Sequence, residues 1–280
     1  MRKTFAFIVL SLVAALASAQ RVSDTNGKHA QLYPDKDHAP GWANPGGGGG
    51  GQNLSYHGGA VIVSAKTVAI FWGSYWGTNG NLNAEASEML GFYGTFGQTP
   101  EYNTITEYSG IQRTNLTNNF FLDTSNPPTN VTDSILQGEV VKYINAHGAD
   151  ASTIYEVFLP PTSYSSLSIY TSCGGPNLYY CAYHSNFNHN GTDIKYASLP
   201  YPSCGGCQWT GWTAAQNFEH FACHETREAV TDPDGDAWYD RRGNEADDKC
   251  AWSPAPFIGT GGYGYQWEWS NQARGCVKTR

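Results

Sequence analysis

The sequence predicts an α/β fold, with one domain built on a mixed sheet, helices packed against it and a loop-rich C-terminal part. Three observations lead to this prediction. Strand-like runs rich in β-branched and aromatic residues alternate with helical patterns up to about residue 147. Further strand-like runs then precede a single helix that ends at Pro233. All seven cysteines lie between Cys173 and Cys276, so disulfides are expected to clamp the C-terminal part.

Residues 1–19 are typical of a secretory signal peptide. Arg2 and Lys3 form a basic start, Phe5–Leu16 is apolar, and Ala17–Ala19 offers a small-residue cleavage site. No later stretch approaches the roughly 20 apolar residues of a membrane span. The formal net charge is −8, or −10 without the two leader cations, which argues against binding to nucleic acid or anionic membranes. We therefore expect a secreted protein.

Residues 20–52 are expected to be a flexible segment, because they are polar, rich in proline and end in six glycines at 46–51. The folded domain is then expected over residues 53–280. Four N-glycosylation sequons fit surface loops of a secreted chain; they begin at Asn53, Asn115, Asn130 and Asn190.

The first half of the domain contains three strand patterns and two helix patterns. Residues 60–72 hold two β-rich runs broken at Ser64–Lys66, and the second, Thr67–Trp72, has the character of a buried strand. Leu82–Phe96 is helical in pattern, with Asn81 or Asn83 as N-cap. Thr104–Tyr108 is expected to form a short strand. Thr132–His147 is an amphipathic helix that Gly148 can end.

The second half contains three strand patterns and the helix that organises the rest of the chain. The strands are expected at Ser152–Leu159, Tyr179–His184 and Asp193–Leu199. The helix is expected over Phe218–Asp232. Its small and apolar residues form one stripe for packing, and its histidines and acids lie on the opposite side; the stripe comprises Ala215, Phe218, Ala222 and Ala229.

This helix carries HExxE at residues 224–228, one residue different from the HExxH zinc signature. His224 and Glu228 are i, i+4 neighbours and face the same way on a helix. A carboxylate can replace the second histidine as a zinc ligand, although it lowers the positive charge left to polarise water. We expect His224 and Glu228 to be metal ligands and Glu225 to be the general base.

A third ligand must come from another part of the chain. Glu245 fits by analogy with zinc enzymes whose third ligand is a downstream glutamate, whereas Asp234 falls ten residues after His224, as in another class. His184 could also face the site. For His184 and His220 the alternative is a hydrogen-bonded core histidine.

A second cation, calcium, is considered for the loop Asp232–Asp240, whose aspartates recur at alternating positions. The loop is not an EF-hand, since Ala237 stands where glycine is needed and Gly243 where a bidentate glutamate belongs. The alternative is a solvated acidic turn.

An odd number of cysteines leaves at least one unpaired, and Cys223 is expected to be that one because it lies mid-helix. Cys173–Cys181 and Cys250–Cys276 are taken as working pairs. Cys204 and Cys207 resemble half of a zinc site, but with no second CxxC a role in disulfides is favoured.

Eight segments spread over residues 56–276 resemble the Exordium or phosphate-induced protein family. They are YHGG (56–59), VAIFWGSYW (68–76), CAYH (181–184), IKYA (194–197), HETREAVTDP (224–233), AWYD (237–240), GNEADDKCAW (243–252) and YQWEWSN (265–271). The pattern HExxEAxTDP resembles the microbial branch, and plant members commonly lack its His-Glu pair.

The resemblance implies a secreted, apoplastic or cell-wall-associated protein linked to growth. It carries over to His224, Glu225 and Glu228, and to Glu245 and Asp248 in the GNExxDKC segment. Asp234 departs from the pattern, because the family often has an apolar residue after TDP. The resemblance therefore favours Glu245 as the third ligand.

Two main functions and one weaker alternative follow from these patterns. The first is a secreted zinc hydrolase of zincin-like architecture, a peptidase or amidase acting on extracellular peptide. The second is a non-catalytic extracellular protein that binds cell-wall polysaccharide and keeps the HExxE as a structural or vestigial site. A carbohydrate-active enzyme that uses paired carboxylates is a third possibility. Nucleic acid and a membrane span are not expected.

Overall fold

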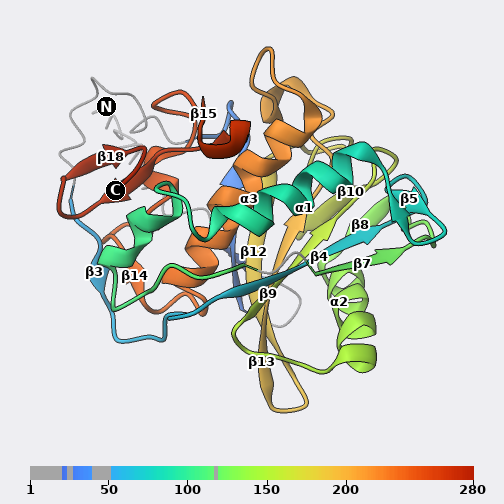
Figure 1. The fold of residues 1–280 in the computed structure, drawn as a ribbon, viewed down its shortest axis with the longest axis horizontal. Coiled ribbons are helices and arrows are strands. Elements are labelled where there is room, and N and C mark those ends of the chain that lie inside the picture. The colour runs from blue at the N-terminus through green and yellow to red at the C-terminus, as the bar shows by residue number, and fades with distance from the viewer. Residues whose placement is uncertain (1–20, 24–27, 40–51, 117–118) are drawn as a thin grey trace, which may run out of the picture.

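The fold is described from a computed structural model, which covers residues 21–23, 28–39, 52–116 and 119–280 (Figure 1). The predicted signal peptide at 1–19 and the glycine run at 46–51 lie outside these residues. Within them, no helix has the length and apolar character needed to cross a membrane.

A seven-stranded mixed sheet forms the centre of the molecule, in the order β1-β2-β12-β13-β9-β4-β7. Strands β13, β9, β4 and β7 run parallel to one another, whereas β1, β2 and β12 are joined by antiparallel pairings. The bounds are β1 Arg21–Ser23, β2 His29–Pro34, β4 Lys66–Trp72, β7 Phe120–Asp123, β9 Thr153–Phe158, β12 Tyr180–His189 and β13 Thr192–Leu199. The mixed α/β sheet is confirmed, and β7 is a strand that the sequence patterns did not reveal.

Three α-helices cover the two faces of this sheet. Helices α1 (Ala84–Phe96) and α3 (Ala214–Thr231) lie side by side on one face, and α2 (Asp133–His147) packs on the other (Figure 1). Strand β4 shows the division, because Phe71 belongs to the core beneath α1 and α3 while Ile70 belongs to the core beneath α2. Alternate side chains of one strand point to opposite faces, so a single apolar run serves both cores.

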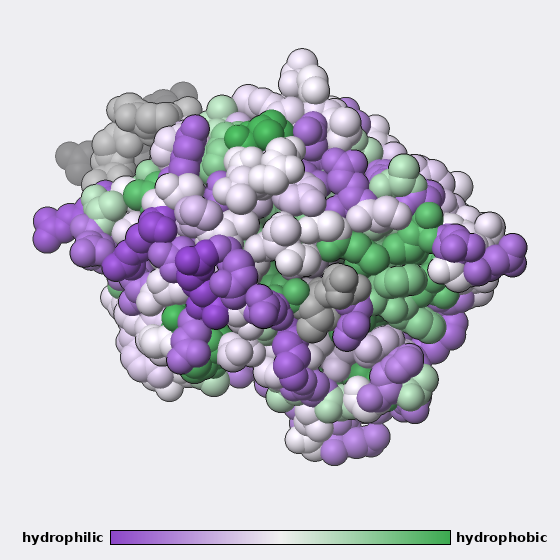
Figure 2. All heavy atoms as spheres, in the orientation of Figure 1, coloured by the Kyte–Doolittle hydropathy of each residue, from purple (hydrophilic) through white to green (hydrophobic). Residues whose placement is uncertain are grey.

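Shorter elements connect and border these layers. Three short strands form a second sheet, β8 (Asn130–Thr132), β10 (Tyr164–Leu167) and β11 (Tyr170–Thr171). Four two-stranded pairs comprise β3 (Ser55–Tyr56) with β14 (Trp238–Tyr239), β5 (Gly77–Thr78) with β6 (Asn81–Leu82), β15 (Phe257–Ile258) with β16 (Gly264–Tyr265) and β17 (Glu268–Ser270) with β18 (Gly275–Val277). Short 3-10 helices occur at Tyr102–Glu107, Gly205–Cys207, Asp248–Cys250 and Thr260–Gly262. Figure 2 shows hydrophilic residues over much of the left half of this face and a hydrophobic area to the right, near β5 and β8.

The helix limits agree with the cap residues in the sequence. Helix α1 starts after Asn83, whose side chain accepts a hydrogen bond from the Ala86 amide at 2.8 Å. Gly148, at a positive φ of 88°, ends α2. Both helices were predicted, and their first residues differ from the prediction by one or two positions.

Two expected strands are absent from the structure. Residues 104–108 belong to the 3-10 helix Tyr102–Glu107, because the Thr99 and Thr104 hydroxyls make local hydrogen bonds with Tyr102 N and Glu101 O that favour a turn. Residues 60–63 form no strand. Their backbone instead bonds to Val230 O through Ile62 N and to Gln112 N through the Val63 carbonyl.

The segment 20–52 is not flexible throughout, which corrects the prediction. Strand β2 pairs antiparallel with β12 inside the sheet. Ala30 and Leu32 are buried in the core beneath α2, and Tyr33 is buried in the opposite core. This two-residue alternation is what a sheet strand requires, and the neighbouring prolines and polar residues obscure it in the sequence.

Three disulfides hold the C-terminal part, joining Cys173 to Cys204, Cys181 to Cys207 and Cys250 to Cys276. The pair Cys250–Cys276 is confirmed, and the pair Cys173–Cys181 was wrong. Each of those two cysteines instead pairs with one cysteine of the CGGC segment at 204–207. Cys223 is buried and free, as expected.

Candidate metal centre

Helix α3 provides most of the candidate site. It begins with a capping box, in which Thr213 accepts from the Gln216 amide at 3.1 Å and the Gln216 side chain accepts from the Thr213 amide at 3.0 Å. All of its residues except Ala214 and Gln216 are buried. The side that carries the histidines and acids is therefore buried as well as the apolar stripe, because β12 and the loop at 244–250 cover it.

His224 and Glu228 face one another across one turn of α3. His224 Nε2 and Glu228 Oε2 are 3.0 Å apart, and both side chains are at most 1% exposed. Within the described part of the chain neither atom has a hydrogen-bond partner, although the distance is short enough for one. Two lone-pair donors held close without a hydrogen bond are typical of ligands that share a metal ion.

The loop after α3 brings carboxylates to this pair. The Asp248 amide donates to Glu228 Oε1 at 2.9 Å, and Asp248 Oδ2 accepts from the Glu245 amide at 3.1 Å. Asp248 Oδ1 lies 3.9 Å from His224 Nε2. The loop is thus fixed to the helix by the same carboxylate that faces His224.

His184 approaches from β12 on the other side of Glu228. Its Nδ1 is hydrogen-bonded to Glu225 Oε2 at 3.0 Å and lies 3.9 Å from Glu228 Oε2. Its Nε2 lies 3.7 Å from Glu245 Oε2. His184 therefore faces the site, and it brings together the expected base and the expected third ligand.

The potential ligand atoms form two groups that share one residue. His224, Glu228 and Asp248 form one group, and His184, Glu225 and Glu228 form the other, with all donor atoms of a group within 4.8 Å of one another. The sequence-based ligand set of His224, Glu228 and Glu245 is thus brought into one cluster. However, Asp248 is the loop acid that groups with His224, whereas Glu245 lies against His184.

Burial dominates the electrostatics of the cluster. It raises the pKa of Glu225, Glu228 and Asp248, and the neighbouring carboxylates raise the pKa of Glu225 and Asp248 further. Burial lowers the pKa of His224. Charged carboxylates in such a setting need a cation for compensation.

Arg227, which lies on the same helix, forms its ion pairs with acids outside the candidate ligand groups. Arg227, fully buried, forms an ion pair with Asp247, and its Nε is 3.1 Å from both Asp247 Oδ2 and Glu268 Oε2. It also donates to the carbonyls of Glu101 and Gln266. This network joins α3 to the loop and to β17, and it leaves the guanidinium without a direct contact to Glu225 or Glu228.

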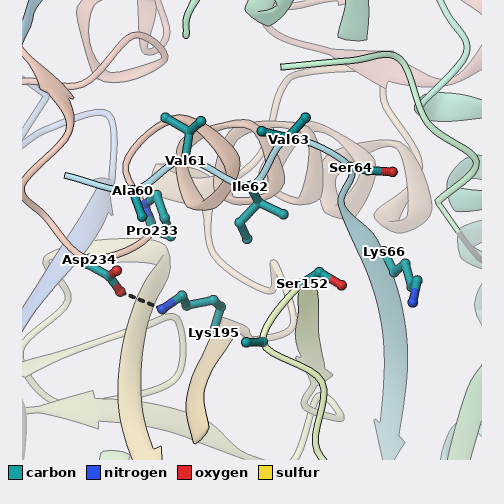
Figure 3. Close-up of a pocket in the computed structure, with 11 residues that line it drawn as sticks. Ala60, Val61, Ile62, Val63, Ser64, Lys66, Ser152, Lys195, Pro233 and Asp234 are labelled. Carbon is teal, nitrogen blue, oxygen red and sulfur yellow. Dashed lines mark hydrogen bonds and ion pairs between the residues drawn. The ribbon is translucent and has the colours of Figure 1, made fainter. Parts of the chain in front are cut away.

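Asp234, the rival third ligand, belongs to a different place. Its Oδ1 is 2.5 Å from Lys195 Nζ and accepts from Asn186 at 2.7 Å. Figure 3 shows Asp234 turned toward Lys195 at the end of a separate pocket of about 690 Å³, bordered by the apolar residues 60–63. The Asp234 carboxylate is not a member of either ligand group.

The aspartates of the loop Asp232–Asp240 also have separate partners. Asp232 Oδ1 accepts from the Ala237 amide at 2.5 Å, and Asp240 accepts from Arg242 N, Asn244 and Lys249. Over residues 232–240, all of which the structure describes, they form no group of three metal-ligating side chains. Calcium binding by this loop stays a prediction.

His220 is a core histidine. Burial lowers its pKa to about 3, so the ring is neutral, and Nε2 lies 2.9 Å from the Tyr33 hydroxyl. The sequence patterns assigned Asp248 no ligand role, although it belongs to a segment that carries the resemblance, and the structure groups it with His224 and Glu228 as a potential ligand. The available signal was the position of Asp248 three residues after Glu245, which allows its side chain to cap the same turn.

No family model, no curated protein and no solved structure matches this chain.

Proposed function

We propose that the protein is a secreted zinc-dependent hydrolase, a peptidase or amidase of zincin-like architecture. The proposal rests on one observation, the pair His224 Nε2 and Glu228 Oε2, 3.0 Å apart and fully buried without a hydrogen bond between them. A hydrolase with this site acts on peptide or amide bonds outside the cell.

His224 and Glu228 would hold the ion together with an acid from the loop. Asp248 takes that position in preference to Glu245, because Asp248 is the acid that groups with His224 and Glu228. One imidazole and two carboxylates are an acceptable zinc set that leaves a fourth position open. Zinc in such a site supplies Lewis acidity.

Glu225 would take the proton from the attacking water. Its Oε2 is held by His184 Nδ1 at 3.0 Å, and its Oε1 is buried and has no hydrogen-bond partner among the described residues. A carboxylate fixed at one oxygen and free at the other can exchange a proton without losing its orientation.

The test measures metal and activity together. Protein purified without added metal is analysed for zinc and assayed on a fluorescence-quenched peptide library. Glu225→Gln should retain zinc and lose cleavage by about 100-fold or more, and Glu228→Gln should lose both. Glu88→Gln, at an exposed position of α1, is the matched control. Wild-type protein that contains no zinc and binds none when zinc is supplied would end the proposal.

The burial of the side chains around the candidate metal site favours a second function. His224, Glu225, Glu228 and Glu245 are 0% exposed, and closed coordination is typical of structural metal sites. In this alternative the protein is non-catalytic and binds wall polysaccharide, with the ion serving stability alone. Retained zinc with no cleavage by the wild type, together with quenching of tryptophan fluorescence by polysaccharide, would favour it.

Secretion and an Exordium-like identity belong to the same proposal. Three disulfides are typical of chains that fold in an oxidising compartment. The asparagines of all four sequons are exposed: Asn53, Asn115, Asn130 and Asn190. Detection of the processed chain in culture medium, with an N-terminus near Gln20, is the direct test.

A further inference from the structure

We propose that the pocket bordered by residues 60–63 binds an extended peptide in which a basic side chain stands between apolar residues. The pocket has a volume of about 690 Å³, and none of its described lining residues belongs to either group of potential metal ligands. The proposal therefore goes beyond the proposed hydrolase and does not depend on a metal ion. Asp234 contacts the basic side chain, and residues 60–63 contact the peptide on either side of it.

The walls of the pocket suit apolar groups. More than half of its lining residues are apolar, and they include the whole of residues 60–63. Figure 3 shows the side chain of Ile62 turned toward Lys195, whereas Val61 and Val63 point away from it. Val63 is 44% exposed, so an apolar side chain remains at the surface beside the pocket. A concave site of this size, apolar with a few polar groups, is typical of ligand-binding sites.

The backbone of residues 60–63 favours a peptide as the ligand. The Ile62 amide and the Val63 carbonyl form hydrogen bonds with other parts of the fold. Within the described part of the chain, the amides and carbonyls of Ala60 and Val61 form none. An extended peptide can add its own backbone hydrogen bonds to such a segment, while its alternate side chains enter adjoining pockets.

The polar end of the pocket has an excess of negative charge. Lys195 Nζ forms ion pairs with two carboxylates, those of Asp193 and Asp234, and Asn186 donates hydrogen bonds to both. One ammonium and two carboxylates leave one negative charge when all three groups are ionised. A ligand cation balances this charge, whereas a ligand carboxylate would be repelled. The charge of the pocket therefore selects a basic side chain.

Asp234 has one oxygen available for that side chain. Its Oδ1 accepts from Lys195 and Asn186, and its Oδ2 accepts no hydrogen bond from the described residues. The Asp234 side chain is 23% exposed, so a ligand can reach it. Burial and the neighbouring Asp193 carboxyl raise the pKa of Asp234, because they disfavour its ionised form. A guanidinium or ammonium group would stabilise that form through a charge-assisted hydrogen bond.

The test is the binding of fluorescein-labelled peptides to the intact, disulfide-bonded chain, measured by fluorescence anisotropy. The probe is Gly-Val-Arg-Val-Gly, and two comparison peptides carry glutamine or glutamate in place of arginine. The arginine peptide should bind. Both comparison peptides should bind at least about tenfold more weakly, because they lack the cation that bonds to Asp234.

Two variants locate the binding, and one variant is their control. Asp234→Asn should weaken binding of the arginine peptide about tenfold, because the amide keeps an acceptor for Lys195 but loses the negative charge. Asp236→Asn removes the same charge from an exposed side chain that does not line the pocket, so it should bind as the wild type does. Ala151→Trp, at an exposed position of the wall, should fill the pocket and abolish binding. Circular dichroism confirms that each variant is folded.

The outcomes separate this proposal from the proposed hydrolase. Glu228→Gln, which lacks a proposed metal ligand, should bind the arginine peptide as tightly as the wild type does. A chain that takes up no zinc and still binds this peptide would end the hydrolase proposal and support the peptide site. Absence of saturable binding by the arginine peptide would overturn the peptide site. Equal binding of the arginine and glutamate peptides, an equal loss in Asp234→Asn and Asp236→Asn, or full binding by Ala151→Trp would overturn it as well.

Discussion

Tyr33 lies against His224, the histidine of the candidate metal centre, with ring centroids 4.4 Å apart. The tyrosine belongs to β2, within the segment that the sequence predicts to be flexible, and His224 belongs to α3. The N-terminal segment therefore forms one wall of the candidate site.

Loss of the Tyr33 hydroxyl should destabilise the fold. Tyr33→Phe leaves the buried His220 Nε2 without its hydrogen-bond partner, which costs about 1–3 kcal/mol of unfolding free energy. Tyr33→Ala should cost about 3–5 kcal/mol, because it also empties a large buried volume. Urea denaturation of the two variants checks this order. Equal stability of Tyr33→Ala and the wild type would show that β2 does not belong to the folded core.

Removal of the metal should lower the stability of chains that keep the proposed ligands, and not that of Glu228→Gln. A ligand at 100 times its dissociation constant adds about 2.7 kcal/mol to the unfolding free energy. A chelator should therefore lower the melting temperature of the wild type and of Glu88→Gln, and leave that of Glu228→Gln unchanged. Differential scanning fluorimetry with and without chelator measures both effects. A chelator response that persists in Glu228→Gln would place the ion elsewhere.

Glu219 should make stability fall as the pH rises. Burial raises its pKa from about 4.5 to about 8, so the folded chain holds a proton that the unfolded chain loses between these values. Relative to the wild type, Glu219→Gln should gain stability from pH 5 to pH 9, on the order of a few kcal/mol at 1.36 kcal/mol per pKa unit. The Gly264 amide, which donates to Glu219 Oε2 at 2.7 Å, can donate to the glutamine oxygen. Urea denaturation of the wild type and of Glu219→Gln at pH 5, 7 and 9 tests this, and an equal difference in stability at all three pH values would contradict it.

The Cys250–Cys276 disulfide should matter for metal binding as well as for stability. It ties the end of the loop that carries Glu245 and Asp248 to β18. Closing a chain segment of 26 residues stabilises the fold by about 3.5 kcal/mol in the chain-entropy view. Replacement of both cysteines by alanine should lower stability by about this amount and weaken zinc binding. Zinc titration and urea denaturation measure the two effects. Unchanged zinc affinity would show that the contacts of the loop with α3 hold it in place without the disulfide.

Local patterns in the sequence predicted a large part of the fold. Periodicity and caps located α1, α2, β4, β9 and β13, because in those segments the local preference and the tertiary structure agree. The 3-10 helix at Tyr102–Glu107 was missed because a run of threonine and isoleucine has the composition of a strand, whereas threonine hydroxyls bonded to the backbone favour a turn. Strand β2 was missed because its pairing partner is about 150 residues away in the sequence.

The candidate site was predictable where its residues share one helix. The i, i+4 spacing of His224 and Glu228 dictates that they face one another. His184 and Asp248 could be placed only by the sheet and the loop, since no spacing along the chain encodes their approach. The choice between Glu245 and Asp248 depends on which carboxylate turns back to the helix, and that is decided by the hydrogen bond from the Asp248 amide to Glu228.

The enclosure of α3 has a consequence for the evolution of the protein. In a helix at the protein surface, the positions that tolerate substitution recur about every 3.6 residues, because these are the exposed positions. Because α3 has only Ala214 and Gln216 outside the buried interior, a saturation scan along it should reveal uniform intolerance with no such rhythm. We therefore expect substitutions in α3 to be tolerated only when the side chains packed against them change as well.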